Sequence, residues 1–298
     1  RALALFVLDP ALLRPAGRPR LTFLHRCLRA LDESLGGRLT VVRGDPAEVV
    51  ARVAAAAGAG PVHVAADYGP YGRRRDAAVE RALAGAGRDL VRSGSPYAVA
   101  PGRVCKADGE PFRVFTPFRR ASAEHGWRAP AATSADMLDR LDPAEVDGGP
   151  RAVRIPDDEP VDTALPEAGE AAARRRWAAF LDDAVRTYGD HRDRPDLPGT
   201  SRMSPYLKYG LAHPRTLLAD LSARRGTSVE VYRSELAWRE FYADVLFHRP
   251  DSARENYDKA FDALPLASGE AARAAFDRWR EGRTGFPIVD AGMRQLRE

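Results

Sequence analysis

The sequence predicts two domains, an α/β domain with a parallel sheet and an all-helical domain, joined by a long linker. In residues 1–100, short apolar runs alternate with amphipathic stretches, as in parallel sheets whose crossover helices cover both faces. Residues 127–166 are rich in Ala, Pro, Asp and Gly and show no periodic pattern. After Glu167, apolar residues recur at helical spacing. We therefore expect domains at 1–126 and 167–298, with the linker at 127–166.

The α/β domain is predicted from three apolar runs and two amphipathic stretches. Strands are expected at 2–8, 39–42 and 62–66, and helices at 21–35 and 46–57. Asp45 suits the N-cap of the second helix and Pro46 its first turn, because Asp accepts a backbone N–H there and Pro has none to satisfy. The alternation predicts a Rossmann-like sheet.

The linker contains the chain breakers Asp142-Pro143, Gly148-Gly149-Pro150 and Asp157-Asp158-Glu159-Pro160. A connection of this length without secondary structure is uncommon inside one compact domain, so we expect it to join two.

The second half is predicted to be helical throughout. Its first helix carries apolar residues at helical spacing: Trp177, Phe180, Leu181, Ala184, Val185 and Tyr188. A second helix starts near His213, with Pro214 in its first turn. A third opens at Thr227, which is expected to form a capping box with Glu230. A last helix is expected to begin near Pro287, after the turn that starts at Gly282.

Composition limits the classes of function without selecting one. The 46 basic and 42 acidic residues give a net charge of +4 and a pI near 9.2, which permits a polyanionic partner but equally fits a GC-rich coding sequence. Cys27 and Cys105 stand far apart without neighbouring His, so we predict no disulfide framework and no metal site. No run approaches the length of a membrane span. We expect a reduced, cytoplasmic protein, cut at both ends since it lacks an initiator Met and a closing tail.

The stretch 188–210 offers groups that bind phosphate. Gly199 is followed by Thr200, Ser201 and Arg202, and then by Ser204 ahead of a helix. Backbone N–H groups, hydroxyls and a guanidinium in this order suit a pyrophosphate. The alternative is that the hydroxyl residues only cap the helix.

The stretch 232–242 lies inside the third predicted helix. Spacings of three, four and seven place Glu235, Trp238, Arg239 and Tyr242 on one face, which then mixes a carboxylate, a guanidinium and two aromatic rings. The alternative is an ion pair between Glu235 and Arg239 on a solvated face, with Trp238 and Phe241 in the core.

Together with the run from Gly282 to Leu296, these stretches resemble the photolyase/cryptochrome family. Its members share, in this order, the run from Tyr188 through Thr-Ser-Arg-x-Ser, the helix Glu-x-x-Trp-Arg-Glu-Phe-Tyr, and Thr-Gly-Phe-Pro-Ile-Val-Asp-Ala-Gly-Met-Arg. The segment 114–118 resembles the one that closes the family's α/β antenna domain, so the likeness covers essentially the whole chain. The chain is most similar to class I cyclobutane pyrimidine dimer photolyases, with both ends missing.

The resemblance implies that the helical domain binds FAD. The family's equivalents of Tyr188 and of the segment 200–204 hold FAD chiefly at its phosphates, and the equivalents of Tyr232, Glu235 and Arg239 line the flavin pocket. The implied FAD-binding residues are Tyr188, Thr200, Ser201, Arg202, Met203, Ser204, Tyr232, Glu235 and Arg239.

The resemblance also implies UV-damaged DNA as partner of a monomeric protein. The implied DNA-binding residues are Arg192, Glu235, Trp238 and Tyr242, with Arg192 on the backbone. Glu235 and Trp238 are the implied catalytic pair, the carboxyl group hydrogen-bonding the pyrimidine edge and the indole stacking on the damaged bases. Chemistry on a base requires taking it out of the stack, as photolyases do.

The implied reaction is light-driven repair of cyclobutane pyrimidine dimers by electron transfer from reduced FAD, the work of a carbon–carbon lyase. Glu at 235 resembles the dimer photolyases, whereas (6-4) photolyases and animal cryptochromes usually carry Gln. The alternative is a cryptochrome-type blue-light photoreceptor that signals through a protein partner. A non-enzymatic nucleotide-binding module would rest on residues 1–100, which lack a Walker A motif and a G-x-G-x-x-G after a strand.

Two departures from the family pattern concern the cofactors. The N-terminal Trp-Phe-Arg-x-Asp-Leu-Arg segment is absent, as is everything after the Met-Arg-Gln-Leu helix, where the family keeps further flavin contacts and its electron-relay tryptophans. We therefore expect an incomplete FAD-binding domain. Residues 103–118, with Glu110, resemble part of the site for an antenna chromophore, either methenyltetrahydrofolate or 8-hydroxy-5-deazaflavin.

Overall fold

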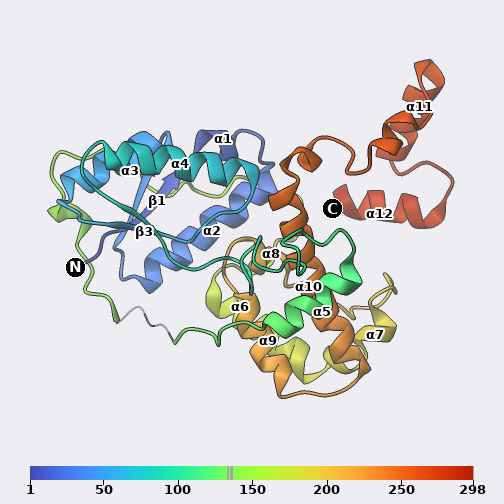
Figure 1. The fold of residues 1–298 in the computed structure, drawn as a ribbon. Helices are drawn as coiled ribbons and strands as arrows, with labels where there is room; N and C mark the ends of the chain where they lie inside the picture. The colour runs from blue at the N-terminus through green and yellow to red at the C-terminus, as the bar shows by residue number, and fades with distance from the viewer. Residues whose placement is uncertain (133, 135–136, 298) are drawn as a thin grey trace.

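The computed structural model describes residues 1–132, 134 and 137–297. Positions 133, 135 and 136 of the predicted linker, and position 298 of the predicted helical domain, lie outside the described residues. An α/β unit occupies one side of the molecule and a helical unit the other (Figure 1). The α/β unit consists of β1 (Ala4–Leu8), α1 (Pro10–Leu13), α2 (Arg18–Ser34), β2 (Leu39–Arg43), α3 (Pro46–Ala56), β3 (Val62–Val64), α4 (Pro70–Ala84) and β4 (Leu90–Arg92).

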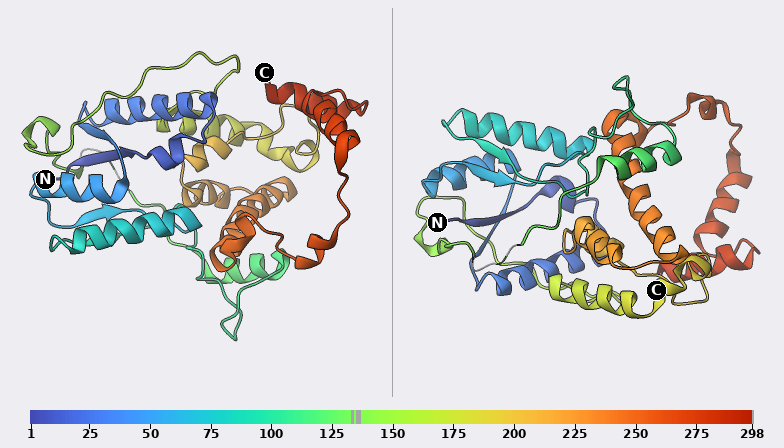
Figure 2. Two further views of the ribbon diagram at one scale, coloured as in Figure 1. Left: turned by 90° about the horizontal axis from the view of Figure 1, so that it is seen from above. Right: turned by 60° about the horizontal axis from the view of Figure 1, so that its bottom comes forward.

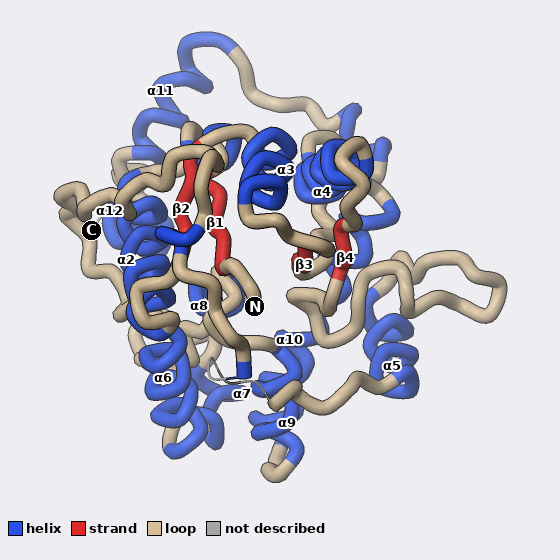
Figure 3. Tube along the Cα trace, turned by 90° about the vertical axis from the view of Figure 1, so that its left-hand side faces the viewer, coloured by secondary structure: helices blue, strands red, loops and turns tan. Residues whose placement is uncertain are grey.

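The α/β unit has the predicted parallel pairing. β1 pairs with β2 from Ala4 opposite Leu39, and β3 pairs with β4 from Val62 opposite Leu90. Helices lie on both sides of these strands (Figure 3). Asp45 caps α3 as predicted, because its carboxylate accepts the N–H groups of Ala47 and Glu48. The α/β class is confirmed.

The helical unit follows the linker region. Its elements are α6 (Glu170–Asp182), η3 (Ala184–Arg186), α7 (Tyr188–His191), α8 (Ser204–Lys208), α9 (Pro214–Ser222), α10 (Thr227–His248), η4 (Pro250–Ala253), η5 (Lys259–Ala263), α11 (Gly269–Arg280) and α12 (Pro287–Arg297). Between 167 and 297, where every residue is described, the structure has no strand, so the all-helical prediction is confirmed. Figure 2 shows α11 and α12 as an arm that stands away from the rest of this unit.

Two local predictions were wrong. The capping box does not form, because α10 is capped by Gly226 at φ 126° and Thr227 already lies inside the helix. Glu230 instead pairs with Arg233 in the next turn. The first helix does not continue to Tyr188, since Asp183 leaves helical geometry at φ −126° and ψ −80° and the chain goes on as a 3-10 turn.

The segment after α5 (Phe115–His125) runs back along the α/β unit. The N–H of Ala2 donates to the Asp139 carbonyl at 2.8 Å, and the N–H of Val153 donates to the Val41 carbonyl at 2.8 Å. Apart from the turn η2 (Pro143–Glu145) and a 3-10 conformation at Met137, its described residues form no helix or strand. It therefore packs against the first unit as extended chain.

The largest core lies in the helical unit and includes residues of α2. Trp177, Leu217 and Leu221 are at most 5% exposed, and Phe23 of α2 contacts Tyr206 and Tyr209 edge to face. The two units thus share apolar packing, which fixes their relative position. Among the described residues, no helix combines the length and the apolar character needed to cross a bilayer.

Candidate functional site

The centre of the candidate site is a group of aromatic rings between α6, α7 and α10. Tyr188 and Tyr232 meet edge to face at 4.9 Å, and Phe180 packs against both rings. Tyr232 is 5% exposed, and its hydroxyl lies 2.8 Å from the Ser201 hydroxyl. Burial raises the pKa of both tyrosines, so both hydroxyls stay neutral at physiological pH. The structure thus brings Tyr188, Ser201 and Tyr232 together.

The segment 200–204 alternates between buried and open side chains. Ser201 and Met203 are buried, whereas Thr200, Arg202 and Ser204 are exposed. Arg176 holds the turn by donating to the carbonyls of Ser201 and Thr200, at 2.9 and 3.3 Å. The alternation presents two hydroxyls and one guanidinium to solvent from five consecutive residues.

Arg202 has the backbone conformation that distinguishes this turn. Its φ of 52° is the only positive φ of a non-glycine residue in the part of the chain that the structure describes. An L-residue in this region is strained by roughly 1–2 kcal/mol. Such strain persists where surrounding contacts fix it and clusters at ligand sites. Here the buried neighbours Ser201 and Met203 fix it.

Arg192 and Glu235 form an ion pair at the edge of the aromatic group. The Arg192 guanidinium donates to the Glu235 carboxylate and lies 5.9 Å from the centroid of the Tyr188 ring. Both side chains remain about one-third exposed, at 29% and 33%. The hydrogen bond that Arg192 donates to Glu235 raises the pKa of Arg192, so the guanidinium stays charged. The predicted DNA residue and the predicted base-contacting residue therefore touch.

Trp238 lies one turn further along α10, in a stack of rings. Its ring is parallel to that of Phe115, with 3.6 Å between centroids and 9° between planes. Tyr242 stacks with it at 5.5 Å and is itself 63% exposed. Trp238 is therefore not an open platform in this arrangement, although its outer neighbour Tyr242 is mostly exposed.

Arg239 turns away from Glu235, so the alternative of an i,i+4 ion pair between them does not hold. Its guanidinium lies 4.6 Å from the Tyr97 ring centroid and donates to the Pro96 carbonyl at 3.1 Å. It also contacts the neighbouring Glu240 at 3.3 Å. The single face predicted from sequence is divided, with Arg239 directed to the loop that follows β4.

Glu240 and Asp244 are two residues of this region that the sequence reasoning missed. Glu240 is 7% exposed and accepts the Val99 N–H at 3.1 Å, and Asp244 is 2% exposed and accepts the Gly102 N–H at 2.7 Å. Burial raises the pKa of Glu240 to about 7. Both acids interrupt the apolar side of α10 four residues apart, and buried acids inside an apolar pattern were the available signal.

A cavity lies elsewhere, between the carboxyl ends of β3 and β4 and the helical unit. Its volume is about 870 Å³, and the residues that line it include Arg73, Arg92, Arg103, Arg128 and Arg215. Parallel sheets bind ligands at this end of their strands.

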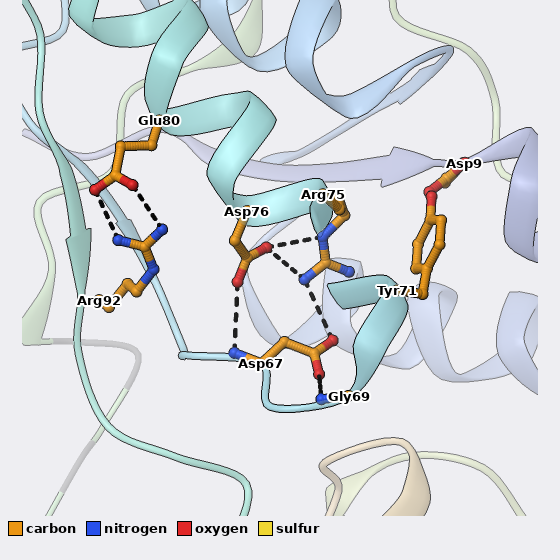
Figure 4. A network of polar contacts seen from close by, with 8 residues as sticks. All are labelled: Asp9, Asp67, Gly69, Tyr71, Arg75, Asp76, Glu80 and Arg92. Atoms are coloured by element: carbon orange, nitrogen blue, oxygen red, sulfur yellow. Dashed lines mark hydrogen bonds and ion pairs between the residues drawn. The ribbon is translucent and has the colours of Figure 1, made fainter. Parts of the chain in front are cut away.

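A polar network orders the sheet side of this cavity (Figure 4). Arg75 joins Asp67 to Asp76, and Asp67 accepts the Gly69 N–H at 3.0 Å. Glu80 holds Arg92 through two hydrogen bonds of 2.8 and 3.0 Å. The network fixes the acidic side of the wall and leaves the cavity with more guanidiniums than carboxylates.

Comparisons with known proteins agree with this architecture. Residues 1–135 match the family model described as DNA photolyase, and residues 232–298 match the FAD binding domain of DNA photolyase. The chain belongs to the photolyase/cryptochrome family. The second match begins at Tyr232, inside α10, and includes Glu235 and Trp238.

Photolyases are among its relatives, and a cryptochrome shares its fold. The deoxyribodipyrimidine photo-lyase of Streptomyces griseus is 37% identical over 98% of this chain and 64% of its own length. A class III photolyase from Agrobacterium tumefaciens superposes with a TM-score of 0.79 at 30% identity, over 99% of this chain and 62% of that one. A Synechocystis cryptochrome gives 0.78 at 20% identity over 98% and 65%, a likeness of fold alone. The chain thus spans less than two thirds of these relatives.

Proposed function

We propose that this photolyase-family chain serves the light-driven repair of cyclobutane pyrimidine dimers in DNA, as part of a deoxyribodipyrimidine photo-lyase. The observation that carries the proposal is the contact between Arg192 and Glu235 beside the Tyr188 ring. It places a phosphate-binding guanidinium next to a carboxyl group suited to a base edge. The name of the Streptomyces griseus relative supports the same reaction.

FAD is the cofactor of this proposal, and the residues present fit it. In the described residues, the side chains of Thr200, Arg202 and Ser204 are exposed and make no hydrogen bond to protein. Two hydroxyls and a guanidinium left open in one strained turn suit a pyrophosphate. Tyr188 and Tyr232 would form the apolar wall beside it. When bound and reduced, FAD supplies the electron that splits the dimer.

Arg192 and Glu235 then act in turn on the DNA. A backbone phosphate competes with Glu235 for the Arg192 guanidinium, because both are anions suited to the same planar donor. Once released, the Glu235 carboxyl group is free to hydrogen-bond the pyrimidine edge of an extruded lesion. The ion pair thereby links backbone binding to base recognition.

Trp238 takes the stacking role in this proposal, with Tyr242 as the movable outer ring. An aromatic platform contributes about 1–3 kcal/mol per stacked base, which helps to offset unstacking of the duplex. Phe115 supports the indole from α5. Tyr242 is exposed and would give way to the damaged bases.

We place the antenna chromophore, methenyltetrahydrofolate or 8-hydroxy-5-deazaflavin, in the cavity of about 870 Å³. Its guanidiniums suit an anionic pigment, and its position follows the rule for parallel sheets. Of the segment 103–118, Arg103 lines this cavity, whereas Glu110 lies in an exposed turn closed by the Lys106 N–H. We keep the domain limits 1–126, 127–166 and 167–298, a monomeric state and a cytoplasmic location as parts of the proposal.

The second candidate is a cryptochrome-type photoreceptor, and the ring stack around Trp238 favours it. Because Trp238 stacks with both Phe115 and Tyr242, base stacking requires a rearrangement that a photoreceptor does not need. Glu235, in the exposed pair with Arg192, favours repair instead.

One experiment separates these functions. The purified chain is saturated with FAD, photoreduced, and illuminated with an oligonucleotide that carries a single thymine dimer, and chromatography measures the repaired strand. Repair that falls with Glu235→Gln supports the proposal. A chain that binds FAD but yields no repaired strand, and no preference for damaged over undamaged DNA, favours the photoreceptor. The matched control is Glu230→Gln, an exposed carboxylate on the same helix.

A further inference from the structure

A second cavity lies on the side of α10 that faces away from Glu235 and Trp238. It has a volume of about 400 Å³ and is enclosed by α5, α9 and α10, which pack side by side in Figure 1. Glu230, Arg233, Ala237 and Glu240 line it at spacings that define one stripe of the helix. It shares none of the predicted FAD or DNA residues.

The walls of this cavity are apolar and its size suits a small molecule. Leu218 and Ala219 contribute from α9, Leu236 and Ala237 from α10, and Trp127 from the chain after α5. Its volume falls in the roughly 300–1,000 Å³ range of small-molecule pockets, which combine apolar walls with a few placed polar groups.

One polar group in the cavity wall makes no hydrogen bond to the protein. Ser122 lines the wall at 8% exposure, and no described residue forms a hydrogen bond with its hydroxyl. Its oxygen is not one of the fully buried unpaired atoms, so the hydroxyl is open to the cavity and can donate to or accept from a bound group. A bound molecule or water at this wall would pair it.

The charges are arranged so that an anion fits at the rim and not at the floor. At the rim, Arg233 holds Glu230, whereas Arg119 reaches the same carboxylate only at 3.8 Å. Arg119 is 44% exposed and forms no other ion pair with the described residues. At the floor, the Glu240 carboxyl group would repel an inserted anion.

We propose that this cavity binds a small aromatic carboxylate, with its ring between α9 and α10, near Ser122, and its carboxylate on Arg119. The proposal uses residues other than those of the repair site, so it stands or falls independently of the proposed function. A guanidinium bonded to a carboxylate at the rim contributes more than the neutral contact that remains when the charge is removed.

The test titrates the 298-residue chain with 2-naphthoate and, separately, with its uncharged isostere 2-naphthalenemethanol. Saturation-transfer NMR detects binding, and the expected dissociation constant is on the order of 1 mM or below for ligands of this size. Arg119→Gln should weaken naphthoate binding roughly five- to tenfold, with little effect on the alcohol, because the pair is partly solvent-screened. Ala219→Phe, which fills the cavity, should abolish binding of both.

The matched control is Arg120→Gln, since Arg120 is exposed on the same helix and does not line the cavity. Naphthoate affinity that is unchanged in this control but reduced in Arg119→Gln supports the proposal. The absence of saturable naphthoate binding, or equal affinity in wild type, Arg119→Gln and Ala219→Phe, overturns it. Arg119→Gln changes an exposed side chain, so the test does not depend on whether Ala219→Phe folds.

Discussion

Glu235 and Glu240 lie five residues apart on α10, yet their surroundings are opposite. Glu235 is one-third exposed and pairs with the guanidinium of Arg192, the residue directly after α7. Glu240 is buried and, besides the contact with its neighbour Arg239, accepts the backbone N–H of Val99 in the loop at 98–102. A phosphate can displace a side-chain partner, whereas a backbone partner belongs to the fold. The comparison teaches that α10 carries two kinds of carboxylate. The partner of Glu235 can be exchanged for a ligand, whereas Glu240 is fixed and joins the helix to the first unit.

The largest expected effect comes from adding a side chain at Gly102, where the loop at 98–102 packs against α10. A Cβ there would lie 2.5 Å from the Phe247 ring of α10, at a φ of 82°. Gly102→Ala should lower the free energy of unfolding by about 3 kcal/mol, because backbone strain and overpacking add. Chemical denaturation measures the change.

Gly109 provides the matched control for this substitution. It has almost the same φ, 83°, but a Cβ would meet nothing within 4 Å. Gly109→Ala should lower the free energy of unfolding by only about 1 kcal/mol, because backbone strain is then the only cost. Equal losses at the two positions would show that the packing of α10 on this loop contributes nothing measurable.

The second prediction uses the pKa of Glu240, which burial raises from 4.5 to about 7. Between these pH values the unfolded chain releases this proton and the folded chain keeps it, so the free energy of unfolding falls as pH rises. The contribution of this residue is roughly 3 kcal/mol across the window. Denaturation from pH 4.5 to 7 should therefore show a shallower decline in Glu240→Gln than in wild type.

Glu235→Gln is the control on the exchangeable side. Glu240 stays buried and intact in this variant, so the decline of stability between pH 4.5 and 7 should persist in Glu235→Gln. A slope that changes as much in Glu235→Gln as in Glu240→Gln would contradict the distinction between the two carboxylates.

The third prediction tests the exchangeable pair on DNA. Arg192→Gln should weaken binding to undamaged duplex and reduce the slope of log K against log salt by about 1, because one phosphate contact is lost. Glu235→Gln should strengthen the same binding by roughly two- to fivefold, since it frees Arg192 for a phosphate. Fluorescence anisotropy at several salt concentrations measures both.

Arg194→Gln is the control for the DNA experiment, because Arg194 is exposed in the same segment and paired with Asp196. Opposite signs for Arg192→Gln and Glu235→Gln, with a smaller change for Arg194→Gln, would support the exchange. If Glu235→Gln weakens binding to undamaged DNA, the ion pair with Glu235 does not restrain Arg192 from binding a phosphate.

The sequence predicted the first three strands, α2 and α3 from their local patterns, but it missed α4, β4, α5 and α11. Asp45 and Pro46 marked the start of α3, and Pro214 and Pro287 those of α9 and α12. The family resemblance implied that Tyr188, Ser201 and Tyr232 belong to one site. The ring stack of Phe115 on Trp238 joins positions far apart in the chain, so no local pattern contained it.

The two carboxylates show the limit most clearly. Glu235 and Glu240 occupy the same predicted helix, and helical spacing alone does not reveal which side meets another unit. The capping box fails for a similar reason. Gly226, at φ 126°, occupies the N-cap position, so Thr227 is already the first residue of α10 and cannot cap it. Side-chain pairing in both places is decided by tertiary contacts that override local preference.

The smallest expected effect concerns Arg202, the strained residue of the segment 200–204. Arg202→Gly should raise the free energy of unfolding by up to about 1 kcal/mol, because glycine adopts a φ of 52° without strain. The same change removes the guanidinium that we assign to the FAD pyrophosphate, so FAD affinity should fall. Arg202→Gln separates the two effects, since it keeps the backbone strain and removes only the charge. We expect Arg202→Gly alone to gain stability and both variants to bind FAD more weakly. This result would show that the strained conformation destabilises the turn but presents a phosphate ligand. Unchanged FAD affinity in both would leave the strain without a role in binding.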